Sequence, residues 1–327
     1  MQAVISVMML WSVLIPSKQW IAAGKPIEIS AKNPTPISLV LTDVSGSSIA
    51  PTRPILLSDG EKIDLRTVYP SLEKAGLFFL FAVPSPEGNA KEPAGNKQNA
   101  FVGTPLVIGV REDRRIGAPP GSMVVRIMPL QFVEMSFTTE KSGDIGTITM
   151  ALFYDSAPVT VENFLKLTGE GFYNDLNIHA ILPGFTLQSG DPRGDGTGGP
   201  GYAIEAEFNN RKHEAGVISM SRMRDPLENA STGVGPRQEF ANSAGSQFFI
   251  CLDYNNTKQY DRNYTAFGRV IDGMKVIETI ARIPLADPKQ GKPQTAVIIK
   301  SAVVKNVDNE HNPYQDIIRL GKSAPKN

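Results

Sequence analysis

Short runs of alternating apolar and polar residues fill the first part of the chain, up to about residue 128, with prolines and glycines between them. Alternation with a period of two predicts β-strands that bury one face, and this region lacks the 3.6-residue period of an amphipathic helix. Short strands at this spacing favour two sheets packed face to face. The runs of strand length are residues 27–31, 37–42, 76–83, 105–111 and 123–128.

The first sixteen residues are apolar, and two interpretations fit them. They could belong to a signal sequence, but they lack a basic N-terminal segment and a clear Ala-x-Ala cleavage site. They are also too short to cross a membrane as a helix. We favour a first strand at residues 11–15 and a second extended segment at 19–21, so a cytoplasmic and an extracytoplasmic location both stay open.

Beyond residue 131 the pattern combines strands with helices. Residues 132–138 and 145–153 alternate on either side of a polar, glycine-containing turn and predict a hairpin. Further strands follow, and the last of them is predicted at residues 295–305. The tail after residue 306 shows little pattern. The chain as a whole is therefore predicted to be mainly β.

Two helices are predicted within this second region. The first has Pro158 in its first turn and Gly169 as its stop. The second is predicted to start with Asp272 as its N-cap and to continue to about residue 281. The apolar face of the first helix consists of Val161, Phe164, Leu165 and Thr168.

Composition and charge exclude several classes of protein. The 33 basic residues balance the 33 acidic ones, so the chain lacks the positive charge expected of a nucleic-acid-binding protein. The single cysteine, Cys251, cannot form a disulfide within the chain. The three histidines are scattered at positions 179, 213 and 311, so no metal-ligand spacing can be assembled and no metal is expected.

Two motifs of the second region stand out. Residues 178–191 read I-H-A-I-L-P-G-F-T-L-Q-S-G-D, and residues 242–249 read N-S-A-G-S-Q-F-F. The first closely resembles the F-H-R-V-I-P-G-F-x-x-Q-G-G-D signature of cyclophilins, which are peptidyl-prolyl cis-trans isomerases, and the second resembles their N-S-x-G-S-Q-F-F strand. The resemblance implies a closed antiparallel β-barrel capped by two helices, with no cofactor. This domain is predicted to span residues 131–306.

A weaker resemblance concerns the first region. Ala-Gly-Lys-Pro at residues 23–26 leads into an alternating strand, and Ala-Gly at 75–76 precedes another. These short motifs resemble those that precede strands in immunoglobulin-like modules. We therefore expect an immunoglobulin-like β-sandwich at residues 10–128 and a C-terminal tail at 307–327.

The cyclophilin resemblance also assigns a peptide site. Rotation about an X-Pro bond has a barrier of roughly 20 kcal/mol, and lowering it requires an apolar pocket for the proline ring, hydrogen-bonding anchors, and a donor aimed at the prolyl nitrogen. Without the resemblance, the aromatic residues at these positions would be ordinary core. His179 and Asn242 are expected to be structural residues near the site. The substrate-binding residues implied are Phe185, Thr186, Gln188, Ser221, Arg222, Gln247, Phe249, Tyr260 and Tyr264.

Three departures from the family pattern bear on function. Ala180 occupies the position of the catalytic arginine, and a methyl group cannot donate a hydrogen bond. Thr186 replaces a methionine that is common beside the pocket phenylalanine, which removes apolar surface. Residues 222–241 form a loop that is longer than is typical of the family. Arg193 and Arg222 are the nearest candidates for a substitute donor.

The sequence therefore predicts a cyclophilin-type isomerase of bacterial character that acts on X-Pro bonds of peptides or protein clients, with reduced activity. The alternative is a catalytically silent module or scaffold that binds proline-containing peptides. The sequence does not choose between the two, and it leaves the oligomeric state open.

Overall fold

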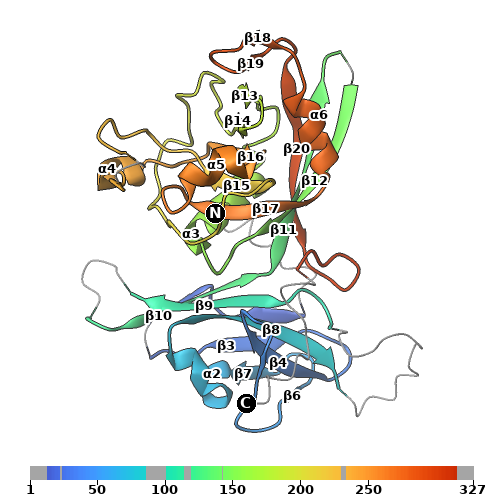
Figure 1. Ribbon diagram of the computed structural model, residues 1–327. Helices are drawn as coiled ribbons and strands as arrows, with labels where there is room; N and C mark the ends of the chain where they lie inside the picture. Colours follow the sequence, from blue (N-terminus) through green and yellow to red (C-terminus); the bar gives the residue numbers. More distant parts are fainter. Residues whose placement is uncertain are drawn as a thin grey trace. The chain divides into compact units, whose positions relative to one another are not determined.

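The computed structural model describes residues 13–22, 24–85, 101–113, 119–141, 143–229 and 233–314. The strand predicted at residues 11–15 and the tail predicted at 307–327 lie partly outside the described residues. The chain divides into two compact units, and the elements of both are drawn in Figure 1. The first unit comprises Met1–Gln131 and Asn306–Asn327, and the second comprises Phe132–Lys305.

The first unit consists mainly of short strands. Prolines and glycines end most of them, as the alternating pattern predicts. A single helical turn, α2, and a 3-10 turn, η1, interrupt the strands and were not predicted. Its elements are β1 (Leu14–Pro16), β2 (Trp20–Ile21), β3 (Glu28–Ala31), β4 (Ile37–Asp43), β5 (Ser48–Ile49), β6 (Leu56–Leu57), β7 (Lys62–Asp64), α2 (Leu65–Val68), η1 (Pro70–Glu73), β8 (Gly76–Pro84), β9 (Leu106–Glu112) and β10 (Met123–Pro129).

These strands form two antiparallel sheets around a common core. The smaller sheet has the order β1-β3-β7, and the larger has the order β2-β10-β9-β8-β4-β5, with β6 paired to β4. Leu14 and Ile29 of the smaller sheet belong to the same buried cluster as Leu41, Leu80 and Ile108 of the larger one. The mainly β prediction is confirmed here, while the immunoglobulin-like assignment stays a prediction.

The segment after residue 306 adds to this unit. The Val307 amide donates to the Leu130 carbonyl, and the Tyr314 hydroxyl donates to the Gln131 carbonyl at 2.7 Å. Val307 and Tyr314 are both buried. The described part of the predicted tail is therefore packed, and the domain boundaries drawn from the sequence stay predictions.

The second unit contains the longer helices. Both lie close to the boundaries that the apolar periodicity and the turn residues predict, and two four-residue helices, α4 and α5, accompany them. Its elements are β11 (Gln131–Thr139), β12 (Gly143–Leu152), α3 (Pro158–Gly169), β13 (Ala180–Leu182), β14 (Thr186–Ser189), β15 (Val217–Met220), α4 (Gln238–Ala241), β16 (Phe248–Cys251), α5 (Tyr254–Thr257), η3 (Lys258–Tyr260), β17 (Ala266–Asp272), α6 (Met274–Ala281), β18 (Leu285–Asp287), β19 (Lys292–Pro293) and β20 (Val297–Asn306).

One sheet of eight strands curls through the second unit, in the order β13-β14-β16-β15-β17-β12-β11-β20. The two edges of this sheet contact each other over a short segment. An isolated bridge joins Asn177 to Ile298, and the Asp175 amide donates a hydrogen bond to the Ile299 carbonyl. Asp175 has a φ of 63°, which interrupts an extended strand at this point. The sheet therefore forms a barrel that is not fully closed, and the prediction of a closed barrel is corrected in this respect.

The two main helices differ in how their first turns are stabilised. At the start of α3 the amides of Val159 and Thr160 donate to the Glu207 carboxylate at 3.0 and 2.8 Å, a cap from a distant part of the chain. The predicted N-cap of α6, Asp272, is wrong, because β17 continues through it and Gly273 holds that position. Gly273 has a φ of 85°, and a Cβ there would lie 2.4 Å from the Thr147 carbonyl oxygen.

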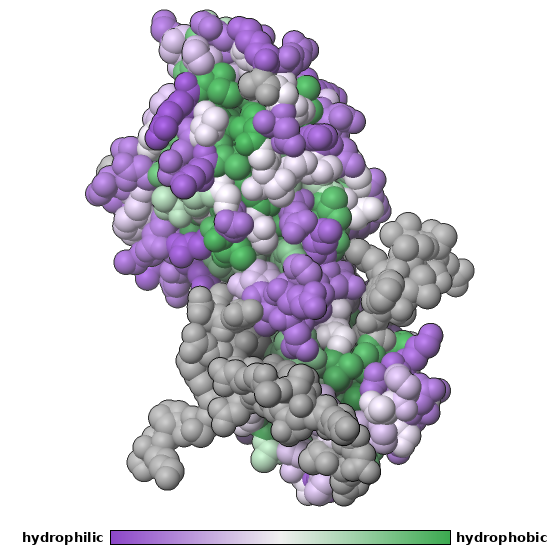
Figure 2. Space-filling model, turned by 90° about the vertical axis from the view of Figure 1, so that its right-hand side faces the viewer, coloured by the Kyte–Doolittle hydropathy of each residue, from purple (hydrophilic) through white to green (hydrophobic). Residues whose placement is uncertain are grey.

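The surface of the second unit is mainly hydrophilic on the face drawn in the upper part of Figure 2, with hydrophobic side chains in between. Ile271 and Val303 are examples of single exposed apolar residues on strands, and these are common on protein surfaces. No helix among the described residues is long and apolar enough to cross a membrane.

Candidate active site

A groove of about 1100 Å³ opens on the second unit. The strands bring segments far apart in the sequence to its walls, since β14 pairs with both β13 and β16. Ala180 of β13, Gln188 of β14 and Phe249 of β16 all line it, together with Lys292 of β19. The two sequence motifs therefore meet at one cavity.

Three aromatic residues form one wall of this groove. The rings of Tyr260 and Tyr264 lie 4.5 Å apart, and Phe249 lies 5.1 Å from the first and 5.6 Å from the second. Phe185 packs behind them, 5.2 Å from Tyr260. Burial raises the pKa of both tyrosine hydroxyls, so each stays protonated at neutral pH. The wall is thus an apolar surface with neutral hydroxyl groups at its edge. We call Phe249, Tyr260 and Tyr264 the aromatic wall.

A fully buried histidine supports the aromatic wall from below. The His213 ring stacks on Phe249 at 6.1 Å and meets Tyr260 edge-on at 6.0 Å. Its Nδ1 lies 3.0 Å from Asp261 Oδ1, and its Nε2 lies 3.1 Å from Ser219 Oγ. Because a carboxylate only accepts, Nδ1 carries the proton and Nε2 accepts from the serine hydroxyl.

This serine, histidine and aspartate have the order of a nucleophilic triad but not its accessibility. Ser219 and His213 are both fully buried, so the serine hydroxyl cannot reach a substrate. The three residues instead fix the orientation of the imidazole beneath Phe249. The sequence analysis missed this support, because His213 and Asp261 are 48 residues apart and belong to neither motif.

The glutamines of the two motifs have different surroundings. Gln188 is half-buried and lines the groove, where its amide can meet a ligand. Gln247 also lines the groove, but its Nε2 donates to the carbonyls of Gly196 and Gly198 at 3.0 and 2.8 Å. Gln247 therefore holds the glycine-rich loop in place.

A buried aspartate shapes the same loop. Asp191 accepts hydrogen bonds from the amides of Arg193 and Asp195 at 2.7 and 3.0 Å. Gly190 has a φ of 84°, and a Cβ there would lie 2.3 Å from the Ser246 carbonyl oxygen. The glycines thus serve the turn geometry and the close approach of two chain segments.

The groove contains cations, but the arginine nearest the aromatic wall is already engaged. The Arg222 side chain is only 2% exposed, and its Nη2 lies 2.8 Å from Glu228 Oε2. Its Nε and Nη1 donate to the carbonyls of Asn263 and Met223, and its guanidinium lies 4.2 Å from the Tyr264 ring centroid. Arg222 is thus buried against the aromatic wall and is not a free donor.

Two other cations line the groove near Ala180. Arg193 is exposed, and no ion pair of its guanidinium occurs within the described residues. Lys292 is also exposed and follows Gly291, whose carbonyl accepts from the amide of Ile181. Ala180 itself is 9% exposed and presents only its methyl group to the groove. The Ala180 side chain itself offers no hydrogen-bond donor.

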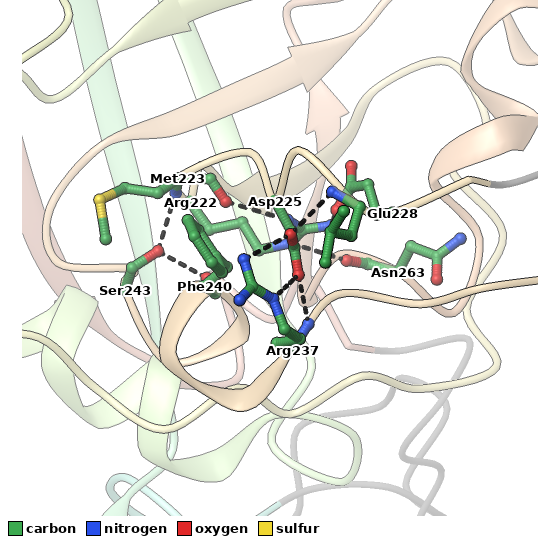
Figure 3. A network of polar contacts seen from close by, with 9 residues as sticks. Arg222, Met223, Asp225, Glu228, Arg237, Phe240, Ser243 and Asn263 are labelled. Atoms are coloured by element: carbon green, nitrogen blue, oxygen red, sulfur yellow. Dashed lines mark hydrogen bonds and ion pairs between the residues drawn. The ribbon is translucent and has the colours of Figure 1, made fainter.

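The long loop after β15 is braced by ion pairs, which Figure 3 draws. The buried Asp225 carboxylate accepts from Nε and Nη2 of Arg237 at 2.9 and 3.0 Å, and from the backbone amide of Arg237 at 2.8 Å. The amide of Leu227 donates to the same carboxylate. These donors hold the pKa of Asp225 well below its usual range, with the Arg237 side chain as the main cause. These contacts therefore hold Asp225, Leu227 and Arg237 of the loop together.

A comparison with protein families decides the assignment of this unit. A family model described as "Cyclophilin type peptidyl-prolyl cis-trans isomerase/CLD" matches residues 134–304, more than half of the chain. The chain belongs to the cyclophilin family. The match covers nearly all of the second unit, which we call the cyclophilin domain.

Two known relatives agree with this assignment. A peptidyl-prolyl cis-trans isomerase of Synechococcus elongatus is 41% identical over 137 residues, which is 41% of this chain and 82% of the relative. Peptidyl-prolyl cis-trans isomerase B of Bacillus subtilis is 39% identical over 140 residues, or 42% of this chain and 85% of the relative. Among solved structures, a Cryptosporidium parvum cyclophilin crystallised with the dipeptide Ala-Pro is 28% identical, with a TM-score of 0.45, and the match covers 54% of this chain and all of that one.

The cyclophilin domain brings together most of the residues predicted for its site. The residues that line the groove directly are Gln188, Ser221, Arg222, Gln247, Phe249, Tyr260 and Tyr264.

Seven of the nine predicted residues thus line the groove of the cyclophilin domain. Phe185 instead backs Tyr260, and Thr186 is fully buried in β14, away from the groove lining. Asn242 accepts a hydrogen bond from the Ala206 amide at 2.9 Å, and the His179 amide donates to the Gln188 carbonyl, so both have structural contacts near the groove. Within the described residues, no cluster of three histidine, cysteine or acidic side chains could hold a metal ion.

The buried His213 and the half-buried His179 predict a pH dependence of stability. Burial lowers the pKa of His213, and the Asp261 carboxylate offsets part of this effect; burial lowers the pKa of His179 in the same direction. A lowered pKa in the folded state means that the unfolded chain binds more protons below about pH 6.5. The free energy of unfolding is therefore expected to be constant above about pH 6.5 and to fall as the pH drops towards the folded-state pKa.

Urea unfolding of the wild type and of His213→Gln at a series of pH values checks this. The wild type should lose more stability on acidification than the variant, because only the wild type takes up a proton at His213 when it unfolds. Equal slopes for the two proteins would show that His213 does not titrate on unfolding.

Proposed function

We propose that the groove of the cyclophilin domain binds X-Pro segments of peptides and proteins and isomerises them slowly. The observation that carries this proposal is an apolar aromatic wall that lines the same groove as Ala180 and Gln188. The binding surface for a proline ring is present, but the position that would hold the catalytic donor carries a methyl group.

The chemistry requires no nucleophile and no metal. As the X-Pro amide twists, its nitrogen loses conjugation and becomes a better hydrogen-bond acceptor, so a donor placed there lowers the barrier. The aromatic wall supplies apolar surface for the ring, and Gln188 supplies both donors and an acceptor for the flanking backbone. These contacts are made in the ground state as well as in the twisted state, so they favour binding more than turnover.

A second candidate function rests on the same alanine. If the groove contacts the X-Pro segment equally in its ground state and its twisted state, the domain is a catalytically silent module that binds proline-containing segments without isomerising them. The two candidates differ only in turnover, because both require the aromatic wall and the groove.

Exchange of a short X-Pro peptide between its cis and trans forms, followed by NMR with and without the protein, tests the proposal. We expect binding together with exchange faster than the spontaneous rate, but well below that given by the Bacillus subtilis isomerase under the same conditions. Binding with no acceleration would favour the silent module. Turnover equal to that of the relative would show that another cation, Arg193 or Lys292, acts as the donor. A protein that does not bind the peptide would contradict both candidates.

A further inference from the structure

The long loop after β15 exposes apolar side chains to an unusual degree. Among the described residues, the three most exposed large hydrophobic side chains are Leu227 at 66%, Met223 at 58% and Val234 at 51%. All three belong to this one loop, whereas the other exposed apolar residues of the cyclophilin domain are spread over other segments. We call Met223, Leu227 and Val234 the loop surface.

The loop surface is held in place by its polar interior. The Asp225 carboxylate binds the amide of Leu227 and the guanidinium of Arg237, and Arg222 pairs with Glu228 (Figure 3). The amide and carbonyl of Asn229 pair with those of Val234. The side chains of Asp225, Arg222 and Glu228 are thus directed inward, while the three apolar side chains of the loop surface remain in solvent. This is the reverse of the arrangement expected for a loop that only covers the protein surface.

A second cavity of about 640 Å³ adjoins the groove and reaches Met223, one residue of the loop surface. Met223 lines this cavity together with Tyr202, which is itself 44% exposed. The cavity and the groove share lining residues, so an extended chain can pass from one to the other. The shared residues are Arg193, Gly196, Ser221, Arg222 and Gln247.

One cation beside the loop surface is available to a partner. Arg224 is exposed, and no ion pair involving it occurs within the described residues, whereas Arg222 and Arg237 are both paired. Arg224 directly follows Met223 of the loop surface in the chain. A carboxylate next to an apolar side chain would complement this arrangement.

We propose that the loop surface and Arg224 form a docking site for the part of the client chain that flanks the X-Pro bond, an extended segment with apolar side chains and a carboxylate. This rests on the proposed function, because the X-Pro bond of the same segment occupies the groove. The docking site would give the domain a preference among proline-containing chains that the groove alone does not provide.

Two fluorescent peptides with the same X-Pro core test this proposal. One carries only the core, and the other is extended on both sides by apolar residues and aspartate. We expect the wild type to bind the long peptide more tightly, and the triple variant Met223→Ser/Leu227→Ser/Val234→Ser to lose about tenfold in affinity for it while it binds the core as before. The matched control is Ile271→Ser/Val303→Ser, which removes exposed apolar side chains elsewhere on the domain and should change neither affinity.

The contribution of the peptide's aspartate carboxylates is tested separately. Arg224→Gln should weaken binding of the long peptide, and replacing its aspartates by asparagine should weaken wild-type binding but not that of the variant. Arg282→Gln, which changes an exposed arginine directly after α6, serves as the control. Arg224→Gln also keeps the test decisive if the triple variant does not fold.

The outcomes separate this proposal from the function on which it rests. If the wild type binds neither peptide, the proposed function fails and the docking site fails with it. If both peptides bind with equal affinity, or the loop variants bind the long peptide as the wild type does, only the docking site is overturned. A wild-type dimer in light scattering that the triple variant abolishes would also overturn it, because a second copy of the chain would then cover the loop surface.

Discussion

Replacing Ala180 with arginine is expected to raise kcat/KM for X-Pro isomerisation by about a hundredfold. Ala180 lines the groove and pairs with Gln188 across β13 and β14, so a longer side chain at this position extends into the cavity that holds the aromatic wall. A guanidinium there can donate to the prolyl nitrogen as it loses conjugation, a contact that strengthens in the twisted state. Exchange kinetics of a short X-Pro peptide measure the gain.

Peptide affinity should change much less than rate, since most contacts with the ground state are already present. Ala180→Met provides the matched control, because it adds length without a donor and should leave the rate unchanged. If Ala180→Arg folds and binds peptide but gains no rate, the groove has been remodelled for binding, and the silent module becomes the better description of this domain.

Replacing Phe249 with alanine is expected to cost about 2 to 4 kcal/mol, shared between folding stability and peptide binding. Phe249 is 3% exposed and contacts Tyr260, Tyr264 and the His213 ring, so its loss opens the aromatic wall and removes core contacts together. Urea unfolding measures the first part of the loss, and peptide titration of the folded variant measures the second.

The neighbouring phenylalanine separates these two effects. Phe248 is 1% exposed and projects from the other face of β16, where it packs on Phe164 and Tyr173 at ring distances of 5.7 and 5.6 Å. Phe248→Ala should destabilise the domain to a similar degree without weakening peptide binding. Binding that survives Phe249→Ala in a folded protein would place the peptide site outside this groove.

The sequence predicted what local patterns encode. The apolar face of α3 and the alternation of β11 and β12 follow from periodicity alone, since each depends on residues close together in the chain. The aromatic wall was found because its members lie in or near two recognisable motifs. Thr186 shows the limit of that reasoning, because the motif does not reveal that β14 turns its side chain into the interior.

Contacts between distant residues were not predictable in the same way. The cap on α3 comes from Glu207, and the support of Phe249 comes from His213 and Asp261, and no periodicity links these positions. The chain has a φ of 63° at Asp175, close to the point where the two edges of the sheet meet, and no periodicity of the sequence indicates this conformation. The polar interior of the long loop likewise results from the pairing of Asp225 with Arg237, which composition alone does not specify.

The buried imidazole of His213 also gives the domain a built-in spectroscopic probe. Its hydrogen bond to Asp261 fixes a single tautomer, and its position beside the Phe249 and Tyr260 rings exposes its protons to their ring currents. The chain has only three histidines, so the imidazole resonances form a small set that can be assigned by substitution. A ligand that shifts the rings of the aromatic wall changes those ring currents. Binding in the groove can therefore be detected as a change in the chemical shift of the His213 imidazole protons, although the ligand does not contact this residue.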